Sequence, residues 1–191
     1  MPLEFDKLFA LGTDSAAFLF FDPDTLTHRV DDDVGWWYED FKQEFTFGKL
    51  AAFITGKDGQ FTLKFVKRHL TSIEKRVLVS KADFRLEVTR GRFYWDNGEA
   101  IPCDFQALDA NEEDKEGWLH LANGKYKLTV HALDWFSVSE DEREAQVDPS
   151  HFIVRLQALE DFEGIPVPTS IPWLMPSKKW HEKRLEKLQS L

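Results

Sequence analysis

The sequence is poor in cysteine and in long apolar runs. Its 191 residues contain one cysteine, Cys103, which cannot form an intramolecular disulfide, so we expect a reducing compartment, most simply the cytoplasm. A transmembrane helix needs about 20 consecutive apolar residues, and no such run occurs. The first apolar run, residues 16–21, is too short for the core of a signal peptide, and residues 1–6 are acidic where a signal peptide would be basic. The sequence predicts a soluble protein that is not exported.

Positive charge is also scarce. Twenty-four Lys and Arg stand against 34 Asp and Glu, which gives a formal net charge of −10. Binding to a nucleic-acid backbone needs a cationic face, so we expect no nucleic-acid partner and favour a basic one. The acids gather in residues 22–44, 104–116 and 140–148. We interpret the second and third groups as solvated loops, whereas the first surrounds aromatic side chains.

Motifs for chemistry are missing. The chain has no phosphate-binding glycine loop, dinucleotide fingerprint, nucleophile elbow or paired zinc ligands. We therefore assign no catalytic residue, cofactor or metal ligand and expect a protein that is not an enzyme. His120 and His131 look like a metal pair, but the register expected below places His120 opposite Lys127 and His131 opposite Glu116. The two imidazoles then lie roughly 13 Å apart at about 3.3 Å per residue, too far for one ion.

Apolar residues alternate with polar ones in short segments joined by turn residues, which is typical of β-hairpins. We expect one hairpin over residues 118–130 with its turn at Asn123-Gly124, and a second around Arg90-Gly91. A third is expected to lead from residues 45–54 through a glycine-bounded turn to residues 61–66. Phe61, Leu63 and Phe65 should share one buried face.

Further strands are expected at residues 16–21, 77–80 and 152–159, and the Thr71 to Glu74 spacing indicates one capped helical turn. Four prolines between residues 166 and 176 predict an extended tail, and Ser177 can cap a helix that runs to about residue 188. The predicted fold is mainly β, an antiparallel sandwich-like domain of hairpins over residues 1–165. Residues 166–191 form the proline-rich tail and a short C-terminal helix that pack on the same domain.

The candidate binding segment lies in the first acidic group. Trp and Tyr are frequent binding hot spots, and acids around them steer a cationic partner. The alternative is that the two tryptophans plug one end of the core. The residues that we predict to bind a partner are Asp31, Asp32, Asp33, Trp36, Trp37, Tyr38, Glu39 and Asp40.

Several segments together resemble an uncharacterised bacterial family, a domain of unknown function. The resemblance rests on residues 13–37 with Phe21-Asp22-Pro23 and Trp36-Trp37, on residues 70–94, and on residues 123–135. Proteins similar to this family are sometimes encoded beside toxins used between competing bacteria. The resemblance implies an immunity protein and carries over no catalytic residue.

The leading hypothesis is a cytoplasmic immunity protein that binds a cognate, basic toxin domain and blocks its active site. Toxins that act on nucleic acids or nucleotides tend to be basic, so an acidic inhibitor associates quickly with them. The rival hypothesis is a regulatory or ligand-binding β-domain, without catalysis, whose small-molecule pocket is lined by Trp95, Trp118 and Trp135. A third hypothesis is an enzyme that uses carboxylates outside known motifs.

Overall fold

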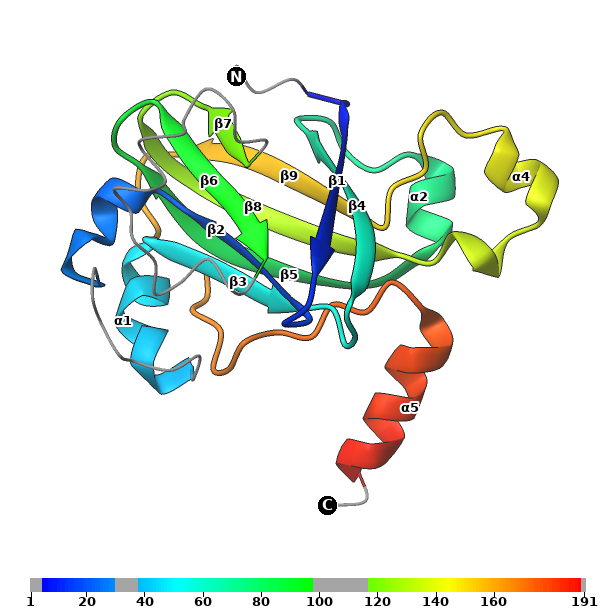
Figure 1. The fold of residues 1–191 in the computed structure, drawn as a ribbon. Coiled ribbons are helices and arrows are strands. Elements are labelled where there is room, and N and C mark those ends of the chain that lie inside the picture. The colour runs from blue at the N-terminus through cyan, green and yellow to red at the C-terminus, as the bar shows by residue number, and fades with distance from the viewer. Residues whose placement is uncertain (1–4, 30–37, 98–116, 190–191) are drawn as a thin grey trace.

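In the computed structural model, the residues that are described are 5–29, 38–97 and 117–189 (Figure 1). They form two β-sheets with short helices around them and a C-terminal helix that extends away from the sheets. None of the helices in these residues is long and apolar enough to cross a membrane. The expectation of a mainly β, sandwich-like fold is confirmed.

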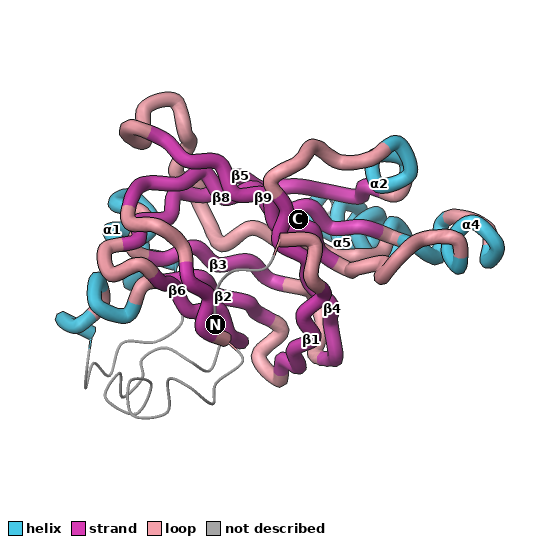
Figure 2. Tube along the Cα trace, turned by 90° about the horizontal axis from the view of Figure 1, so that it is seen from above, coloured by secondary structure: helices cyan, strands magenta, loops and turns pink. Residues whose placement is uncertain are grey.

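The two sheets have five and four strands. The five-stranded sheet has the order β1-β4-β9-β8-β5 and the four-stranded sheet the order β3-β2-β6-β7. Figure 2 shows β5, β8 and β9 in one layer and β2, β3 and β6 in the other. The strands are β1 (Leu8–Thr13), β2 (Ala17–Phe21), β3 (Leu50–Ile54), β4 (Gly59–Val66), β5 (Leu78–Val88), β6 (Arg92–Asn97), β7 (Trp118–His120), β8 (Gly124–Leu133) and β9 (Phe152–Leu159).

The helices are short and lie outside the sheets. They are α1 (Tyr38–Phe47), α2 (Ser72–Arg76), α4 (Glu140–Glu144) and α5 (Lys178–Gln189), with 3-10 turns at Pro23–Thr25, Thr27–Arg29 and Trp135–Ser137. The predicted capped turn is α2, where Thr71 Oγ1 accepts from the Glu74 backbone N–H and the Glu74 carboxylate accepts from the Thr71 N–H. Both α1 and α4 were missed, and residues 45–47 belong to α1 and not to a strand.

Aromatic side chains from both sheets fill the space between them. Phe18, Phe53 and Trp95 come from the four-stranded sheet, and Phe65 and Phe152 from the other, all at most 2% exposed. Phe61 and Leu63 join Phe65 in this core, as their alternation predicts. The inward-facing residues of β4 were thus predicted correctly.

The strand partners, by contrast, were predicted wrongly. The three segments in which hairpin turns were expected each carry the chain from one sheet to the other. They are residues 55–58, 89–91 and 121–123. Strand β5 pairs with β8 and not with β6, and β7 pairs with β6 and not with β8. Residues 14–16 between β1 and β2 form a fourth such crossing. Facing strands therefore contribute to one core without sharing backbone hydrogen bonds.

The four turns that carry the chain from one sheet to the other, here called crossing turns, are linked two by two through side-chain hydrogen bonds. The Thr55 hydroxyl donates to the Ala16 carbonyl at 3.0 Å, which ties turn 55–58 to turn 14–16. The Asn123 side-chain oxygen accepts from the Gly91 N–H, which ties turn 121–123 to turn 89–91. Asn123 thus holds two crossings together and does not close a hairpin.

Strand β9 completes the five-stranded sheet from late in the sequence. It lies between β8, with which it pairs antiparallel, and β4, with which it pairs parallel. The sheet is therefore not wholly antiparallel. Residues 152–159, predicted as a strand, match β9.

The two sheets differ in how their outer faces are covered. On the four-stranded sheet, Leu19 and Phe21 are buried on the outer side under Phe41 and Phe45 of α1. The tail joins the edge of this sheet, because the Ile54 N–H donates to Pro172 at 2.8 Å and the Leu174 N–H donates back to Ile54 at 2.8 Å. On the five-stranded sheet, a polar patch of β5, β8 and β9 remains open as a cleft.

Candidate functional site

The predicted binding segment is only partly described. Asp31, Asp32, Asp33, Trp36 and Trp37 lie outside the described residues. Tyr38, Glu39 and Asp40 form the first turn of α1, and only their backbone is described. Their role in partner binding stays a prediction.

Helix α1 is anchored from below by its own aromatic residues. Phe41 and Phe45, four residues apart, are 1% and 3% exposed and pack on the four-stranded sheet. Glu44 lies beside them at 3% exposure and contacts His28 Nε2 at 3.0 Å. The helix ends at Phe47, and the next residue, Gly48, has a φ of 75° that favours glycine; a Cβ there would lie 2.6 Å from the Phe162 ring. The helix therefore has a fixed position and a fixed end.

A buried carboxylate fixes the chain just before the predicted segment. Asp22 is fully buried and accepts hydrogen bonds from the Thr89 backbone N–H at 2.7 Å and hydroxyl at 2.8 Å. Its other oxygen accepts from the Asp24 N–H at 3.1 Å and caps the turn Pro23–Thr25. Asp22 is thus a structural group, although it belongs to the first acidic cluster of the sequence.

The three tryptophans of the rival hypothesis do not line one pocket among the residues that the structure describes. Trp95 is buried in the core between the sheets, Trp118 on the outer face of the four-stranded sheet and Trp135 in a third cluster beside α2. Each is at most 7% exposed. The prediction failed because it grouped the three residues by type, whereas the sheet crossings separate them.

The expected position of the histidines was also wrong in detail. His120 lies opposite Arg92 in the four-stranded sheet, and His131 lies between Lys81 and Ile153 in the five-stranded sheet. Among the residues that the structure describes, no three His, Cys, Asp or Glu side chains are grouped closely enough to hold a metal ion. Cys103 lies outside those residues.

A second candidate site is a cleft on the open face of the five-stranded sheet. Its volume is about 290 Å³, and we call it the cationic cleft. Its floor comes from β5, β8 and β9, and its wall from the segment that leads into α2 and from α2 itself. It is lined by His69, Leu70, Lys75, Leu78, Lys81, Asp83, Lys127, Thr129, His131 and Arg155.

One carboxylate lies in the floor of the cationic cleft. Asp83 accepts a hydrogen bond from Thr129 Oγ1 at 2.6 Å and forms an ion pair with Lys127 at 2.8 Å. Burial by itself raises the pKa of Asp83, but the hydrogen bonds from Lys127 and Thr129 outweigh it and hold the pKa below its ordinary 3.8. Asp83 therefore stays ionised and neutralises one of the cations around it.

His131 lies beside this carboxylate and is 8% exposed. Its Nδ1 donates to the Ile153 carbonyl at 3.2 Å, which fixes the ring. Burial lowers its pKa below the ordinary value of 6.5, and the charges of Lys81 and Arg155 act in the same direction. The ring is therefore neutral at pH 7 while the groups around it are mostly cationic.

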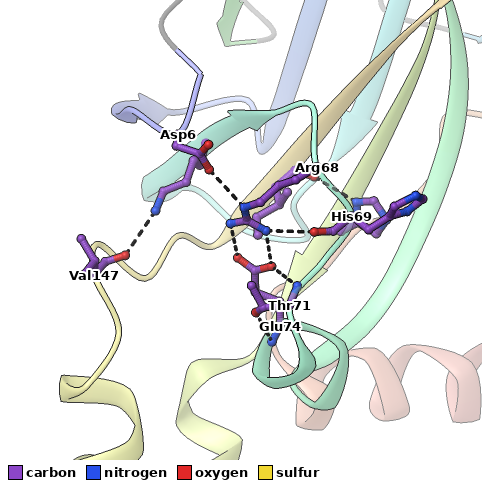
Figure 3. A network of polar contacts seen from close by, with 9 residues as sticks. Asp6, Arg68, His69, Thr71, Glu74 and Val147 are labelled. Carbon is purple, nitrogen blue, oxygen red and sulfur yellow. Dashed lines mark hydrogen bonds and ion pairs between the residues drawn. The ribbon is translucent and has the colours of Figure 1, made fainter.

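The wall of the cationic cleft is held by an ion-pair network (Figure 3). Arg68 donates to both carboxylate oxygens of Glu74, at 2.7 and 2.8 Å, and its Nε lies 3.3 Å from Asp6. Glu74 is 7% exposed and also caps α2 at Thr71. Burial raises the pKa of Glu74, but the hydrogen bonds from Arg68 and Thr71 lower it further than burial raises it. The ionised pair fixes the segment that carries His69, Leu70 and Lys75.

The sequence indicated part of this site without identifying it. In the predicted hairpin, the alternation of residues 126–131 puts Lys127, Thr129 and His131 on one side of the strand, and all three line the cleft on the outer face of β8. Their neighbours were missed, because Lys81 and Asp83 come from β5 and Arg155 from β9. A basic patch made of three strands has no spacing signature in the sequence.

Comparison with known proteins gives one family and two structural likenesses. A family described as being of unknown function, DUF6386, matches residues 5–133, from before β1 to the end of β8, and leaves β9 out. No curated protein sequence matches the chain.

Among solved structures, one titled Crocagin biosynthetic gene J is 14% identical, with a TM-score of 0.49 over 79% of this chain and 95% of that chain. Another is ComJ from Bacillus subtilis, titled as an inhibitor of the DNA-degrading activity of NucA. It is 12% identical, with a TM-score of 0.47 over 80% of this chain and 96% of that chain. At these values neither likeness supports a function.

Proposed function

The chain belongs to the DUF6386 family, whose function is unknown, and we propose that it is an inhibitory binding protein for a basic toxin domain. The membership confirms the resemblance to a domain of unknown function. The proposed contact is the acidic aromatic segment of residues 31–40, and the proposed place of action is the cytoplasm. Inhibition follows because the bound chain covers the active site of the toxin.

The observation that carries the proposal is the anchoring of α1. The last three residues of the segment, 38–40, form the first turn of this helix, whose Phe41 and Phe45 are buried on the four-stranded sheet. Contact residues on a fixed element lose less conformational entropy on binding than residues on a free loop. A partner that meets the start of α1 therefore meets a surface that is already positioned.

Charge supports a basic partner. The formal net charge of −10 attracts a cationic domain from a distance and speeds its association. A run of carboxylates can also occupy a site that normally holds the phosphates of a nucleic acid. The proposal therefore requires that association be fast at low salt and slower at high salt.

Packing between the sheets supports binding at the surface. The inner faces of the described strands are filled by large side chains, including Phe18, Phe53, Phe65 and Trp95. Sandwiches and barrels that hold a ligand inside keep part of this space open. A partner that meets the outside of the protein is the better fit.

The test begins with the tagged full chain as bait in its native host, followed by mass spectrometry and a mixing ratio for the captured partner. We expect a one-to-one complex with a basic domain. Trp37→Ala and Asp40→Ala should each weaken that complex by about tenfold or more, as hot-spot residues do, with no change in thermal unfolding.

Asp141→Ala is the matched control, because Asp141 is an exposed acid on α4 and its removal changes the net charge equally. Its affinity should change little at physiological salt. Unchanged affinity in both the Trp37 and the Asp40 variants would remove residues 31–40 from the interface. A partner that is not basic would contradict the electrostatic argument.

A further inference from the structure

The floor of the cationic cleft is a regular grid of outward-facing side chains. In strand register, Lys81 lies beside His131 and Asp83 lies beside Thr129. Thr129 in turn lies beside Arg155 of β9. Neighbouring strands lie about 4.8 Å apart, so long side chains of adjacent rows reach the same space above the sheet. The sheet thus brings together charges from residues more than 70 positions apart.

Most of the positive charges in the cleft form no ion pair within the described part of the chain. Lys127 is paired with Asp83, whereas Lys75, Lys81 and Arg155 form no ion pair with any residue that the structure describes. The Nε of Arg155 is buried and has no hydrogen-bond partner in that part of the chain. Four cations and one carboxylate leave a local surplus of three positive charges.

This surplus runs against the composition of the whole chain. With a net charge of −10, the protein has enough carboxylates to pair every cation, yet the cleft contains one. Like charges gathered in one cleft repel one another, and a bound anion would relieve this repulsion. A bound anion would also give a partner to the guanidinium of Arg155.

We propose that the cationic cleft binds the phosphate group of a small phosphorylated molecule. A phosphate monoester carries a charge of about −1.5 to −2 at pH 7, which matches the surplus better than a single carboxylate does. The volume of about 290 Å³ leaves room for an attached organic group and is close to the lower end of ligand pockets, about 300–1,000 Å³. Leu70 and Leu78 supply an apolar wall for that group.

A nucleic-acid polymer does not fit the same cleft. Its binding needs a cationic surface that follows several phosphates, whereas this patch is local and belongs to a strongly acidic protein. The cleft lies on the five-stranded sheet, whereas α1 packs on the four-stranded sheet, and the proposal does not depend on the toxin partner.

The experiment is calorimetric titration of the full chain with adenosine 5′-monophosphate and with inorganic phosphate, at low and at physiological salt. Adenosine and acetate are the ligand controls. We expect both phosphate probes to bind saturably in the millimolar range or tighter, and adenosine and acetate not to bind. Affinity should fall with salt, because the contact is ionic.

Variants separate the cleft from other cations. Arg155→Gln should weaken phosphate binding by about tenfold or more, since a charge-assisted hydrogen bond is lost, and Lys81→Gln should weaken it several-fold. Asp83→Asn should strengthen it, which a mere loss of structure would not do. Lys179→Gln, an exposed site on α5 outside the cleft, should leave it unchanged. Thermal unfolding of each variant shows that it is folded.

Three results would overturn the proposal. They are the absence of saturable binding of either phosphate probe, wild-type affinity in both Arg155→Gln and Lys81→Gln, and equal binding of acetate. Preferential binding of a nucleic-acid oligomer over the monophosphate would also overturn it. None of these results bears on capture of the toxin domain, so the two proposals fail separately.

Discussion

Replacing Phe152 by alanine tests whether β9, which lies beyond the residues matched by the family, is essential to the core. Phe152 is 0% exposed at the start of this central strand. Its ring centroid lies 4.9 Å from that of Phe53, 5.7 Å from that of Phe61 and 6.1 Å from that of Phe18. Those neighbours come from both sheets, so the side chain packs across the whole sandwich.

The expected cost of Phe152→Ala is about 3–5 kcal/mol in the free energy of unfolding, because the apolar transfer energy is lost and the rigid neighbours leave a cavity. The free energy of unfolding of a native domain is about 5–15 kcal/mol in all, so the expected loss is a large part of it. Urea unfolding followed by tryptophan fluorescence measures it, and the midpoint should fall while the slope stays constant.

Gln157→Ala is the control on the same strand. Gln157 is exposed on β9, and its removal should change the free energy of unfolding by less than about 0.5 kcal/mol. If Phe152→Ala cost less than about 1.5 kcal/mol, roughly what one methyl group costs in a core, the central position of β9 would be wrong. Partner capture by the folded fraction should be retained, because Phe152 lies in the core between the sheets and is not one of the proposed contact residues.

Two further predictions concern single groups. His151 Nδ1 accepts from the Thr62 backbone N–H at 3.0 Å, and burial lowers its pKa below the ordinary 6.5; the unfolded chain therefore binds the proton more readily. The contribution of His151 to the free energy of unfolding should be complete above about pH 6.5 and decrease as the pH drops below that value. His151→Asn keeps a hydrogen-bond acceptor but does not titrate, so the difference in the free energy of unfolding between pH 7.5 and pH 5.5, measured by urea unfolding, should be smaller in this variant. Thr71→Ala removes the N-cap of α2 and should lower the free energy of unfolding by about 1 kcal/mol, as measured by urea unfolding. The control is Ser72→Ala, at the next residue, which does not cap the helix. An equal loss in both variants would contradict the capping role.

The sequence predicted correctly which face of a strand is buried, but it was misleading about which strands pair with each other. Alternation placed Phe61, Leu63 and Phe65 in the core because the two-residue period is a local property of an extended chain. Asn123-Gly124 has the composition of a tight hairpin turn, yet Asn123 accepts from Gly91 and the chain changes sheets there. Turn residues determine that the chain reverses its direction locally, whereas the packing of distant strands determines which sheet the next strand joins.

Helix α1 and the cationic cleft were missed for related reasons. Within α1, Phe41 and Phe45 are the inward residues, and the buried Glu44 between them interrupts the apolar stripe that would mark a helix. The cleft joins Asp83, Lys127 and Arg155, three residues from strands whose pairing only the fold supplies. Residues 31–37, the clearest functional signal in the sequence, lie outside the described residues.

The crossing turns have a consequence for the order in which the protein can fold. Because turns 14–16, 55–58, 89–91 and 121–123 each change sheets, no ladder in the described residues is closed by a tight hairpin turn, and most ladders join strands that are not consecutive in the chain. High contact order of this kind slows folding, because the entropy of closing long loops is lost before the strand pairs form their stabilising contacts. On the ribosome, the five-stranded sheet stays split into a β1-β4 pair and a β5-β8 pair until β9 emerges. Until that moment the edges of β4 and β8 are unpaired, so the nascent chain is most prone to aggregate just before its last strand is made.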